Sequence, residues 1–358
     1  MTKLFSETKL GEMTLQNHVV MAPMTRNRAI DNIPNAMMAK YYEQRSSVGL
    51  IITEGTSPSP NGLGYPRIPG LFSPAQIEGW KLVTQAVHQK GAKIFCQLMH
   101  TGRISHGSNL PFGGHVLAPS AIACSEQVYT DADGIQALPV PKAMSLAEVK
   151  ATKVEYVQAA SNAVKAGFDG VELHAANGYL MEQFFRPTTN QRTDAYGGSC
   201  EKRARFIIET ATESCEAIGA DKVGIRISPF GVFNEMPPYP EMEADYLYLV
   251  EELNKIGLAY VHIVDHSGMG APEVPDSIKQ GIRERFKGTL ILSGGYDADR
   301  AEKDLTEGKA DLIAVGVPLL SNPDLLERWK QKKELNKVDF DTFYTPGEKG
   351  YTDYPTMK

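Results

Sequence analysis

The sequence contains few cysteines, and none of them is placed as a metal-binding or redox pair would be. Cys96, Cys124, Cys200 and Cys215 lie far apart and form no Cys-x-x-Cys motif. This spacing excludes the usual ligand patterns of zinc ribbons and iron–sulfur clusters. We therefore expect four reduced thiols and no metal site.

Long apolar runs and long runs of one charge are also missing. No stretch is long enough to cross a bilayer, and residues 1–11 lack the apolar segment of a signal peptide. The formal net charge is -6, which predicts no basic surface for nucleic acid or anionic lipid. The expected protein is cytoplasmic, with no nucleic-acid and no membrane partner.

What the chain does contain is a recurring pattern of short apolar runs separated by helical stretches. Its 358 residues are 42% hydrophobic, enough for a large core. We predict eight strands at His18–Ala22, Val48–Thr53, Lys93–Leu98, Gly170–His174, Val223–Ser228, Tyr260–Val264, Thr289–Ser293 and Leu312–Val315. Helical periodicity indicates helices at Ser73–Lys90, Ser145–Ala166, Glu201–Ile218, Glu243–Ile256 and Asp299–Glu307. This alternation predicts one α/β domain over residues 1–358, a (β/α)8 TIM barrel.

Two segments do not belong to a minimal barrel. Residues 3–15 indicate a hairpin around Gly11 that could plug the N-terminal end of the barrel. Residues 100–142, between the third strand and the following helix, contain two short apolar runs around Asp133-Gly134. Asp-Gly between such runs is a strong hairpin signal, so we predict a β-hairpin lid over the mouth of the barrel.

Chemistry in this fold gathers at the C-terminal ends of the strands. Taken singly, each polar residue there has a structural explanation: His174 could be a core histidine, Arg226 could pair with Glu172, and Thr25 could cap a helix. Ser293-Gly294-Gly295 could be only a turn, although such glycines also expose N–H groups to phosphates. Together they indicate a functional site, because all of them fall at one end of the barrel.

Several motifs, in the same order, carry a resemblance to a known family. They are Ala22-Pro23-Met24-Thr25-Arg26, Gln97-Leu98-Met99-His100-Thr101-Gly102-Arg103, His174-Ala175-Ala176-Asn177-Gly178-Tyr179-Leu180, Arg192-Thr193-Asp194-Ala195-Tyr196-Gly197-Gly198-Ser199, Ser293-Gly294-Gly295 and Gly350-Tyr351-Thr352-Asp353-Tyr354-Pro355. The chain resembles, over nearly its whole length, the old yellow enzyme family of FMN-dependent ene-reductases.

The resemblance implies a non-covalently bound FMN across the barrel mouth. Thr25 would donate toward the flavin O4, Gln97 would meet the amide edge of the ring, and Arg226 would stabilise the charge of the reduced ring. The residues implied in cofactor binding are Pro23, Met24, Thr25, Gly55, Gln97, Arg226, Ser293, Gly294, Gly295, Gly316 and Val317.

The resemblance also implies a reaction. His174 and Asn177 would donate to one oxygen of the substrate while hydride passes from the flavin N5 to the β-carbon, and Tyr179 would protonate the α-carbon. Tyr65, Met99, Phe230, Tyr344 and His100 are further candidates for lining the substrate pocket. The substrates would be small activated alkenes or nitro compounds: α,β-unsaturated carbonyls, maleimides and nitroalkenes. No G-x-G-x-x-G follows a strand, so NADPH or NADH would visit the same pocket in ping-pong fashion.

Two residues depart from the family pattern. Val317 follows Gly316 where the family usually has an arginine for the FMN phosphate. Met99 stands where many relatives have tryptophan, which would open one wall of the pocket. Asn177, where some members have a second histidine, is within family variation.

Two other functions remain open from the residues alone. His174, Asp265, His266 and Glu172 could serve as ligands in a metal-dependent barrel hydrolase, although the first strand lacks the usual His-x-His. A non-catalytic flavin-binding protein could share the same fold. The sequence also leaves open the physiological substrate, the preferred nicotinamide and whether the protein is a monomer or a homodimer.

Overall fold

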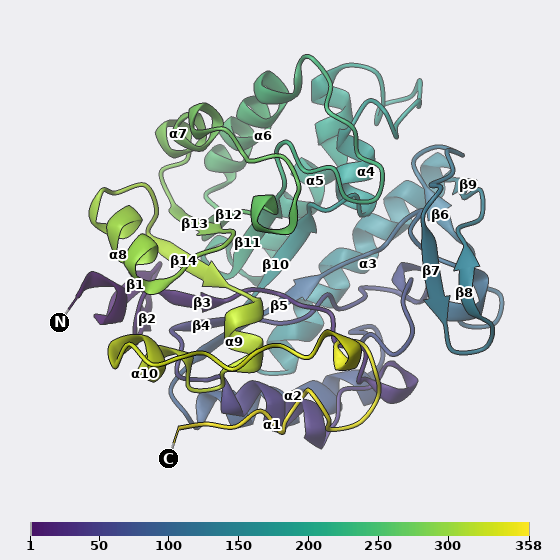
Figure 1. Cartoon of the computed structure of the whole chain (residues 1–358). Helices are drawn as coiled ribbons and strands as arrows, with labels where there is room; N and C mark the ends of the chain where they lie inside the picture. Colours follow the sequence, from purple (N-terminus) through teal and green to yellow (C-terminus); the bar gives the residue numbers. More distant parts are fainter. Residues whose placement is uncertain (1, 358) are drawn as a thin grey trace.

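The computed structural model describes residues 2–357, and its centre is a closed barrel of eight strands in the order β10-β11-β12-β13-β14-β3-β4-β5 (Figure 1). All neighbouring strands are parallel. The strands are β3 (Val19–Met21), β4 (Leu50–Ile52), β5 (Lys93–Leu98), β10 (Gly170–Ala175), β11 (Val223–Ile227), β12 (Tyr260–Ile263), β13 (Thr289–Ser293) and β14 (Leu312–Val315). The TIM barrel and its eight predicted strands are confirmed.

The helices form an outer layer around the barrel (Figure 1). They are α1 (Ala36–Gln44), α2 (Pro74–His88), α3 (Leu146–Lys165), α4 (Leu180–Phe185), α5 (Cys200–Ile218), α6 (Met242–Ile256), α7 (Asp276–Arg285), α8 (Ala298–Thr306), α9 (Val317–Ser321) and α10 (Leu325–Lys330). The five predicted helices are confirmed as α2, α3, α5, α6 and α8. None of the helices in the described part of the chain is long and apolar enough to cross a membrane.

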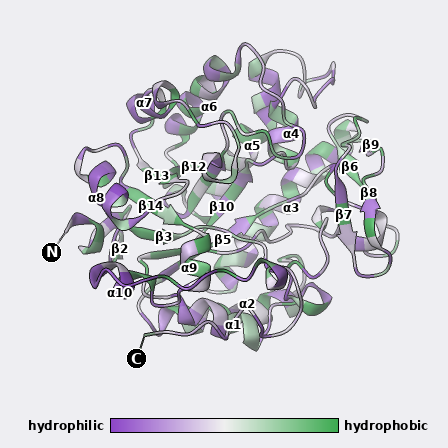
Figure 2. Ribbon diagram, viewed as in Figure 1, coloured by the Kyte–Doolittle hydropathy of each residue, from purple (hydrophilic) through white to green (hydrophobic). Residues whose placement is uncertain are grey.

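The barrel interior is filled by alternate residues of the strands, as the two-residue period of a strand requires. The strands stand out as hydrophobic segments in Figure 2. The rings of Phe95 and Tyr260 lie 5.7 Å apart between centroids inside the barrel. A Cβ on Gly170 would lie 2.5 Å from the Phe95 ring, and one on Gly224 would lie 2.2 Å from the Tyr260 ring. These two glycines therefore make room for the aromatic layer that closes the barrel interior.

A hairpin plugs the N-terminal end of the barrel, as predicted. Strand β1 (Thr8–Leu10) pairs antiparallel with β2 (Met13–Leu15). Leu10 and Leu15 are fully buried and pack with the residues that fill the barrel.

The lid predicted between the third barrel strand and the next helix is also present. Strands β7 (Gln127–Thr130) and β8 (Gly134–Ala137) form an antiparallel hairpin, and Gly134 has a φ of +70° at its turn. Two short strands, β6 (Leu117–Ala118) and β9 (Lys142–Ala143), pair at its base. The hairpin stands beside the barrel mouth in Figure 1.

Candidate active site

A layer of buried polar side chains lies directly above the aromatic layer of the barrel. Glu172 is fully buried. Its carboxylate accepts a hydrogen bond of 2.8 Å from Gln97 Nε2 and interacts with His262 Nδ1 at 2.9 Å. Glu172 is thus satisfied by an amide and an imidazole, and it forms no ion pair with Arg226 among the residues that the structure describes.

Arg226 is a buried cation that forms no ion pair with any of residues 2–357. It lies beside His174 in the register of β10 and β11, and it is 6% exposed. Within residues 2–357 its buried Nε has no hydrogen-bond partner. Burial lowers the pKa of Arg226, although Glu172 acts in the opposite direction. Because a buried charge is costly without a partner, this guanidinium suits an electron-rich ligand.

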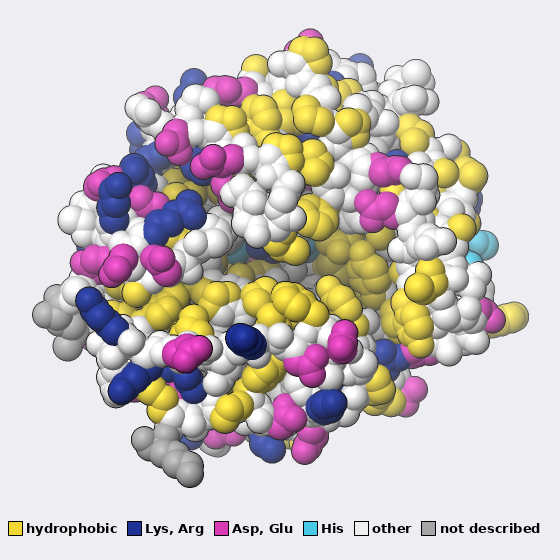
Figure 3. Space-filling view, viewed as in Figure 1, with side chains coloured by type: hydrophobic (Ala, Val, Ile, Leu, Met, Phe, Trp, Pro, Cys, Tyr) yellow, Lys and Arg dark blue, Asp and Glu magenta, His cyan; other side chains and the backbone are white. Residues whose placement is uncertain are grey.

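Arg226 faces a cavity of about 750 Å³ at the C-terminal mouth of the barrel. Figure 3 shows the hollow, with hydrophobic side chains around its rim. Of the residues implicated from the sequence, the cavity is lined by Pro23, Met24, Thr25, Tyr65, Gln97, Met99, His174, Asn177, Tyr179, Arg226, Val317 and Tyr344. Residues from strand ends more than 200 positions apart therefore meet in one space.

His174 is a neutral histidine with a fixed tautomer. Burial, followed by the charge of Arg226, lowers its pKa well below the usual value. The backbone N–H of Ala176 donates to His174 Nδ1 at 3.3 Å. Since Nδ1 accepts, the proton of the neutral ring lies on Nε2. His174 is thus a hydrogen-bond donor at the cavity wall.

Asn177 is held with its amide in a defined orientation. It adopts a left-handed backbone conformation, with φ +59°, which asparagine tolerates better than most residues. His266 Nε2 lies 3.0 Å from Asn177 Oδ1, and burial lowers the pKa of His266 to about 4. The neutral His266 donates to this oxygen, which leaves the Asn177 NH2 group as a second donor.

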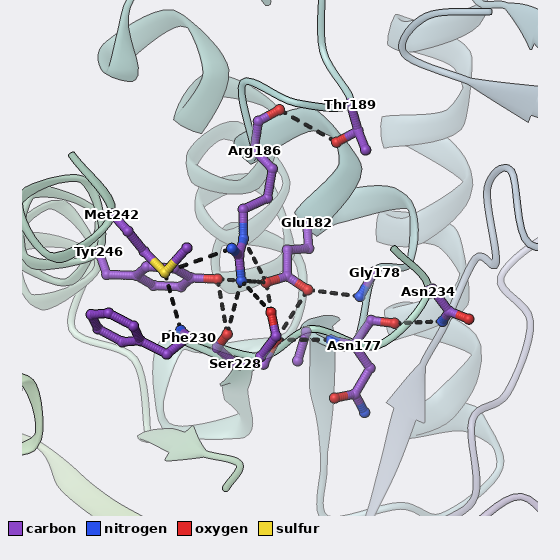
Figure 4. A network of polar contacts seen from close by, with 12 residues as sticks. Asn177, Gly178, Glu182, Arg186, Thr189, Ser228, Phe230, Asn234, Met242 and Tyr246 are labelled. Atoms are coloured by element: carbon purple, nitrogen blue, oxygen red, sulfur yellow. Dashed lines mark hydrogen bonds and ion pairs between the residues drawn. The ribbon is translucent and has the colours of Figure 1, made fainter. Parts of the chain in front are cut away.

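A buried network anchors the turn that carries Asn177 (Figure 4). Ser228 Oγ accepts from the Asn177 N–H at 2.9 Å, and Glu182 accepts from the Gly178 N–H at 2.7 Å. Glu182 also accepts from Arg186 Nη2 at 2.8 Å and from the Tyr246 hydroxyl at 2.6 Å. The ion pair between Glu182 and Arg186 is almost completely buried. It therefore fixes the turn with charge-assisted bonds that water does not screen.

Tyr179 follows this turn and brings a hydroxyl to the same wall. Its ring packs edge-on against His174, with centroids 4.9 Å apart. The hydroxyls of Tyr179 and Tyr65 lie 3.1 Å apart. Burial raises the pKa of Tyr179 to about 12, so the phenol stays protonated at neutral pH.

The loops after β13 and β14 present backbone donors. Gly294 and Gly295 have φ angles of +119° and +62°, and a Cβ on Gly294 would lie 2.5 Å from the Asp265 carbonyl oxygen. The N–H groups of Gly294, Gly295, Gly316 and Val317 find no acceptor anywhere in the described chain. Clustered free N–H groups of this kind suit an anion.

These features fit FMN. Free N–H groups at one end suit its phosphate, and an unpaired buried arginine suits the electron-rich edge of its ring. The Gln97 amide, fixed by Glu172, offers a further polar contact in the same cavity.

Some residues implicated from the sequence do not line the cavity. Phe230 packs against the hydrophobic core, and its backbone N–H donates to Met242 Sδ at 3.2 Å. His100 is fully buried, and burial lowers its pKa to about 3.

Gly55 lies behind the cavity wall, because a Cβ at this position would lie 2.5 Å from the Met99 Sδ. Met99 thus occupies space that this glycine leaves open. Ser293, Gly294, Gly295 and Gly316 also lie outside the lining, the last three as the backbone donors described above.

Other cavity residues carried no recognisable sequence signal. The hairpin contributes Gln127, Val128, Tyr129 and Ile135, and the C-terminal segment contributes Phe340, Asp341, Phe343, Thr345 and Pro346. Arg67 joins these two parts, because it forms an ion pair with Asp131 of the hairpin and donates to the Tyr344 carbonyl at 3.2 Å. Asn27, Arg67 and Met269 complete the lining.

A metal centre of the kind weighed above does not assemble in the described part of the chain. No group of three His, Cys, Asp or Glu side chains is arranged there to hold a metal ion. Asp265 instead forms an ion pair of 3.2 Å with Lys279, and His266 contacts Asn177.

Known proteins resemble this chain over its whole length. The model of the NADH:flavin oxidoreductase / NADH oxidase family matches residues 3–336. A chanoclavine-I aldehyde reductase of Penicillium roqueforti is 44% identical over 368 residues, covering 99% of this chain and 96% of the relative. The structure of morphinone reductase matches with a TM-score of 0.95 and 43% identity, covering 99% of this chain and 96% of that one. The old yellow enzyme homologue of Zymomonas mobilis matches with a TM-score of 0.94 and 38% identity, covering 99% and 100% of the two chains.

Proposed function

Because the chain belongs to the NADH:flavin oxidoreductase / NADH oxidase family and is an old yellow enzyme homologue, we propose that it reduces activated carbon–carbon double bonds with NAD(P)H. It is an FMN-dependent oxidoreductase. When bound, FMN supplies the hydride that adds to the β-carbon of the alkene, after taking it from the nicotinamide.

One observation carries the proposal. Two neutral donors, His174 and Asn177, and a protonated phenol, Tyr179, line one cavity together with Arg226, whose buried Nε has no hydrogen-bond partner in the described chain. A donor pair beside a proton source is what the reduction of a conjugated double bond requires, because negative charge develops on the substrate oxygen before the α-carbon is protonated.

Each residue has a role that follows from its surroundings. His174 and Asn177 bind the carbonyl or nitro oxygen of the substrate and polarise the double bond. Loss of one such donor typically slows a reaction about 100-fold to 1000-fold. Tyr179 gives its hydroxyl proton to the α-carbon, and Tyr65 positions that hydroxyl from 3.1 Å.

The remaining side chains of the cavity bind the cofactor. Thr25 and Gln97 orient the ring, and Arg226 favours its reduced, negatively charged state. Pro23, Met24 and Val317 contribute the apolar surface beside it. The backbone N–H groups of the loops after β13 and β14 hold the phosphate.

We extend the proposal to the whole chain. Residues 1–358 work as one FMN-binding domain, located in the cytoplasm, as a monomer or a homodimer, and without nucleic-acid partners. The substrates are small electrophilic alkenes, including enones, maleimides and nitroalkenes, and also nitro compounds. The apolar rim formed by Tyr129, Ile135 and Phe340 suits substrates with a hydrophobic body.

The test is spectroscopic. Protein purified with FMN should be yellow, should lose its flavin absorbance under NADPH without air, and should regain it when 2-cyclohexenone is added. Absorbance that NADPH and NADH both leave unchanged, or that no enone, maleimide or nitroalkene restores, would refute the proposal.

A further inference from the structure

The loops after β13 and β14 offer free N–H groups beside the cavity but no cation in direct sequence with them, since Val317 follows Gly316. A phosphate monoester carries a charge of about −1.5 to −2 at neutral pH. Free N–H groups alone leave most of this charge without a counter-ion. The charged arginines that line the cavity are Arg67 and Arg226, and Arg67 already pairs with Asp131.

A different arginine lies next to the same loop. Arg300 is in the first turn of α8, where its backbone N–H donates to the helix cap Asp297 at 2.8 Å. Its side chain folds back toward the loop after β13. There Nη1 donates to the Gly294 carbonyl at 2.8 Å and lies 3.8 Å from the position of a Cβ on Gly295.

The guanidinium is held in place but has most of its donors free. Its Cζ lies 4.2 Å from the centroid of the Tyr296 ring. That ring is buried and is fixed by a hydrogen bond of 2.8 Å from its hydroxyl to Asp304. Within the described chain Arg300 has no ion-pair partner, and the bond to Gly294 is the only one made by its five side-chain N–H groups. The nearby cation Lys279 is in contrast paired with Asp265.

We propose that Arg300 supplies the positive charge for the phosphate of FMN, beside the free N–H groups of the loops after β13 and β14. The inference rests on the proposed function, because it assumes that FMN occupies the cavity. In this arrangement the cation reaches the phosphate from the first turn of α8, outside the cavity lining, while the backbone of Gly294 and Gly295 provides the neutral donors. Arg300 also fixes the Gly294 carbonyl and thereby the direction of the adjacent N–H groups.

The test compares two flavins that differ only in the phosphate. The dissociation constants of FMN and riboflavin are measured by fluorescence quenching on the apoprotein and on the Arg300→Gln variant. We expect Arg300→Gln to weaken FMN binding about tenfold at low ionic strength, because one charge-assisted contact is lost, and to leave riboflavin binding within about twofold of wild type. Raising the salt concentration should weaken FMN binding to the wild type more than to the variant.

Matched variants separate charge from folding. Lys303→Gln removes a positive charge from the exposed face of the same helix and should leave the affinity for FMN unchanged. Val317→Arg in the Arg300→Gln background should restore FMN binding, because it places a cation next to the same free N–H groups. Equal FMN affinity in wild type and Arg300→Gln, or equal loss of both flavins, would overturn the assignment of Arg300. Failure of the wild type to bind either flavin would refute the proposed function itself, and the inference with it.

Discussion

Replacing Tyr179 by phenylalanine removes one oxygen atom from the cavity and leaves the ring that carries it in place. The ring contact with His174, at 4.9 Å between centroids, does not involve the hydroxyl. The variant loses one hydrogen bond, to Tyr65 at 3.1 Å, which is worth about 1 kcal/mol of stability. A folded protein without its proposed proton donor is therefore expected.

The expected effect is on one half of the catalytic cycle. Removal of a general acid slows its step about 100-fold to 10,000-fold, and the proton is needed when the alkene is reduced, after the nicotinamide has left. Anaerobic stopped-flow measurements of flavin absorbance follow the two half-reactions separately. Tyr179→Phe should slow re-oxidation by 2-cyclohexenone at least 100-fold and change reduction by NADPH less than tenfold. Tyr65→Phe, the matched control, retains the donor and should slow re-oxidation less than tenfold.

The pKa of Tyr179 adds a dependence on pH. Burial raises this pKa from 10.0 to about 12, and the phenol donates only while it is protonated. At pH 10 an unshifted phenol would be about half ionised, whereas this one would be about 1% ionised. The rate of re-oxidation should therefore stay level up to pH 10 and fall only as the pH approaches 12. Equal slowing of both half-reactions in Tyr179→Phe, or a rate that halves by pH 10 in wild type, would refute the role of Tyr179 as donor.

Three further variants test other parts of the site. His266→Ala removes the donor that orients Asn177. We expect the KM for enones to rise several-fold more than kcat falls, and His266→Gln to restore part of the loss. An unchanged KM would contradict the role of His266. Gly55→Ala places a Cβ 2.5 Å from the Met99 thioether, which should move Met99 toward the cavity. The value of kcat/KM should then fall more for a bulky enone than for 2-cyclohexenone. An equal fall in kcat/KM for both substrates would argue against this movement. Glu182→Gln leaves Arg186 as an uncompensated buried charge, so the free energy of unfolding in urea should drop by about 3–5 kcal/mol. The control Glu78→Gln removes a carboxylate from an exposed pair with Lys81 and should change the free energy of unfolding by less than about 1 kcal/mol.

Where local pattern decides the structure, the sequence was a good guide. Strands β5, β13 and β14 have the predicted bounds, and the short apolar runs of β13 and β14 are bounded on both sides by glycine or aspartate. Helices α2 and α3 begin after Ser73 and Ser145, each of which forms a capping box. Helix α7 was missed: its ten residues include Gly281 and only two other buried residues, so its apolar stripe is weak.

The sequence predicts the part of the site that lies on strand ends. It does not predict the part that loops contribute. Gln97, His174 and Arg226 line one cavity because parallel strands bring their C-terminal ends together. Phe340 and Phe343 line the same cavity from a segment without periodic pattern, and only tertiary packing brings them there. The sequence suggests His266 as a possible metal ligand together with His174, Asp265 and Glu172, and it gives no sign that the partner of His266 is Asn177.

Arg67 gives the entrance of the cavity a particular architecture. Its guanidinium forms an ion pair with Asp131 of the β-hairpin and donates to the carbonyl of Tyr344 in the C-terminal segment. One side chain thus connects two stretches of chain that are more than 200 residues apart in the sequence. The groups proposed for proton and hydride chemistry lie below, on the rigid barrel. Substitutions in the hairpin and the C-terminal segment can therefore change which substrates enter the cavity without altering the residues proposed for the reaction.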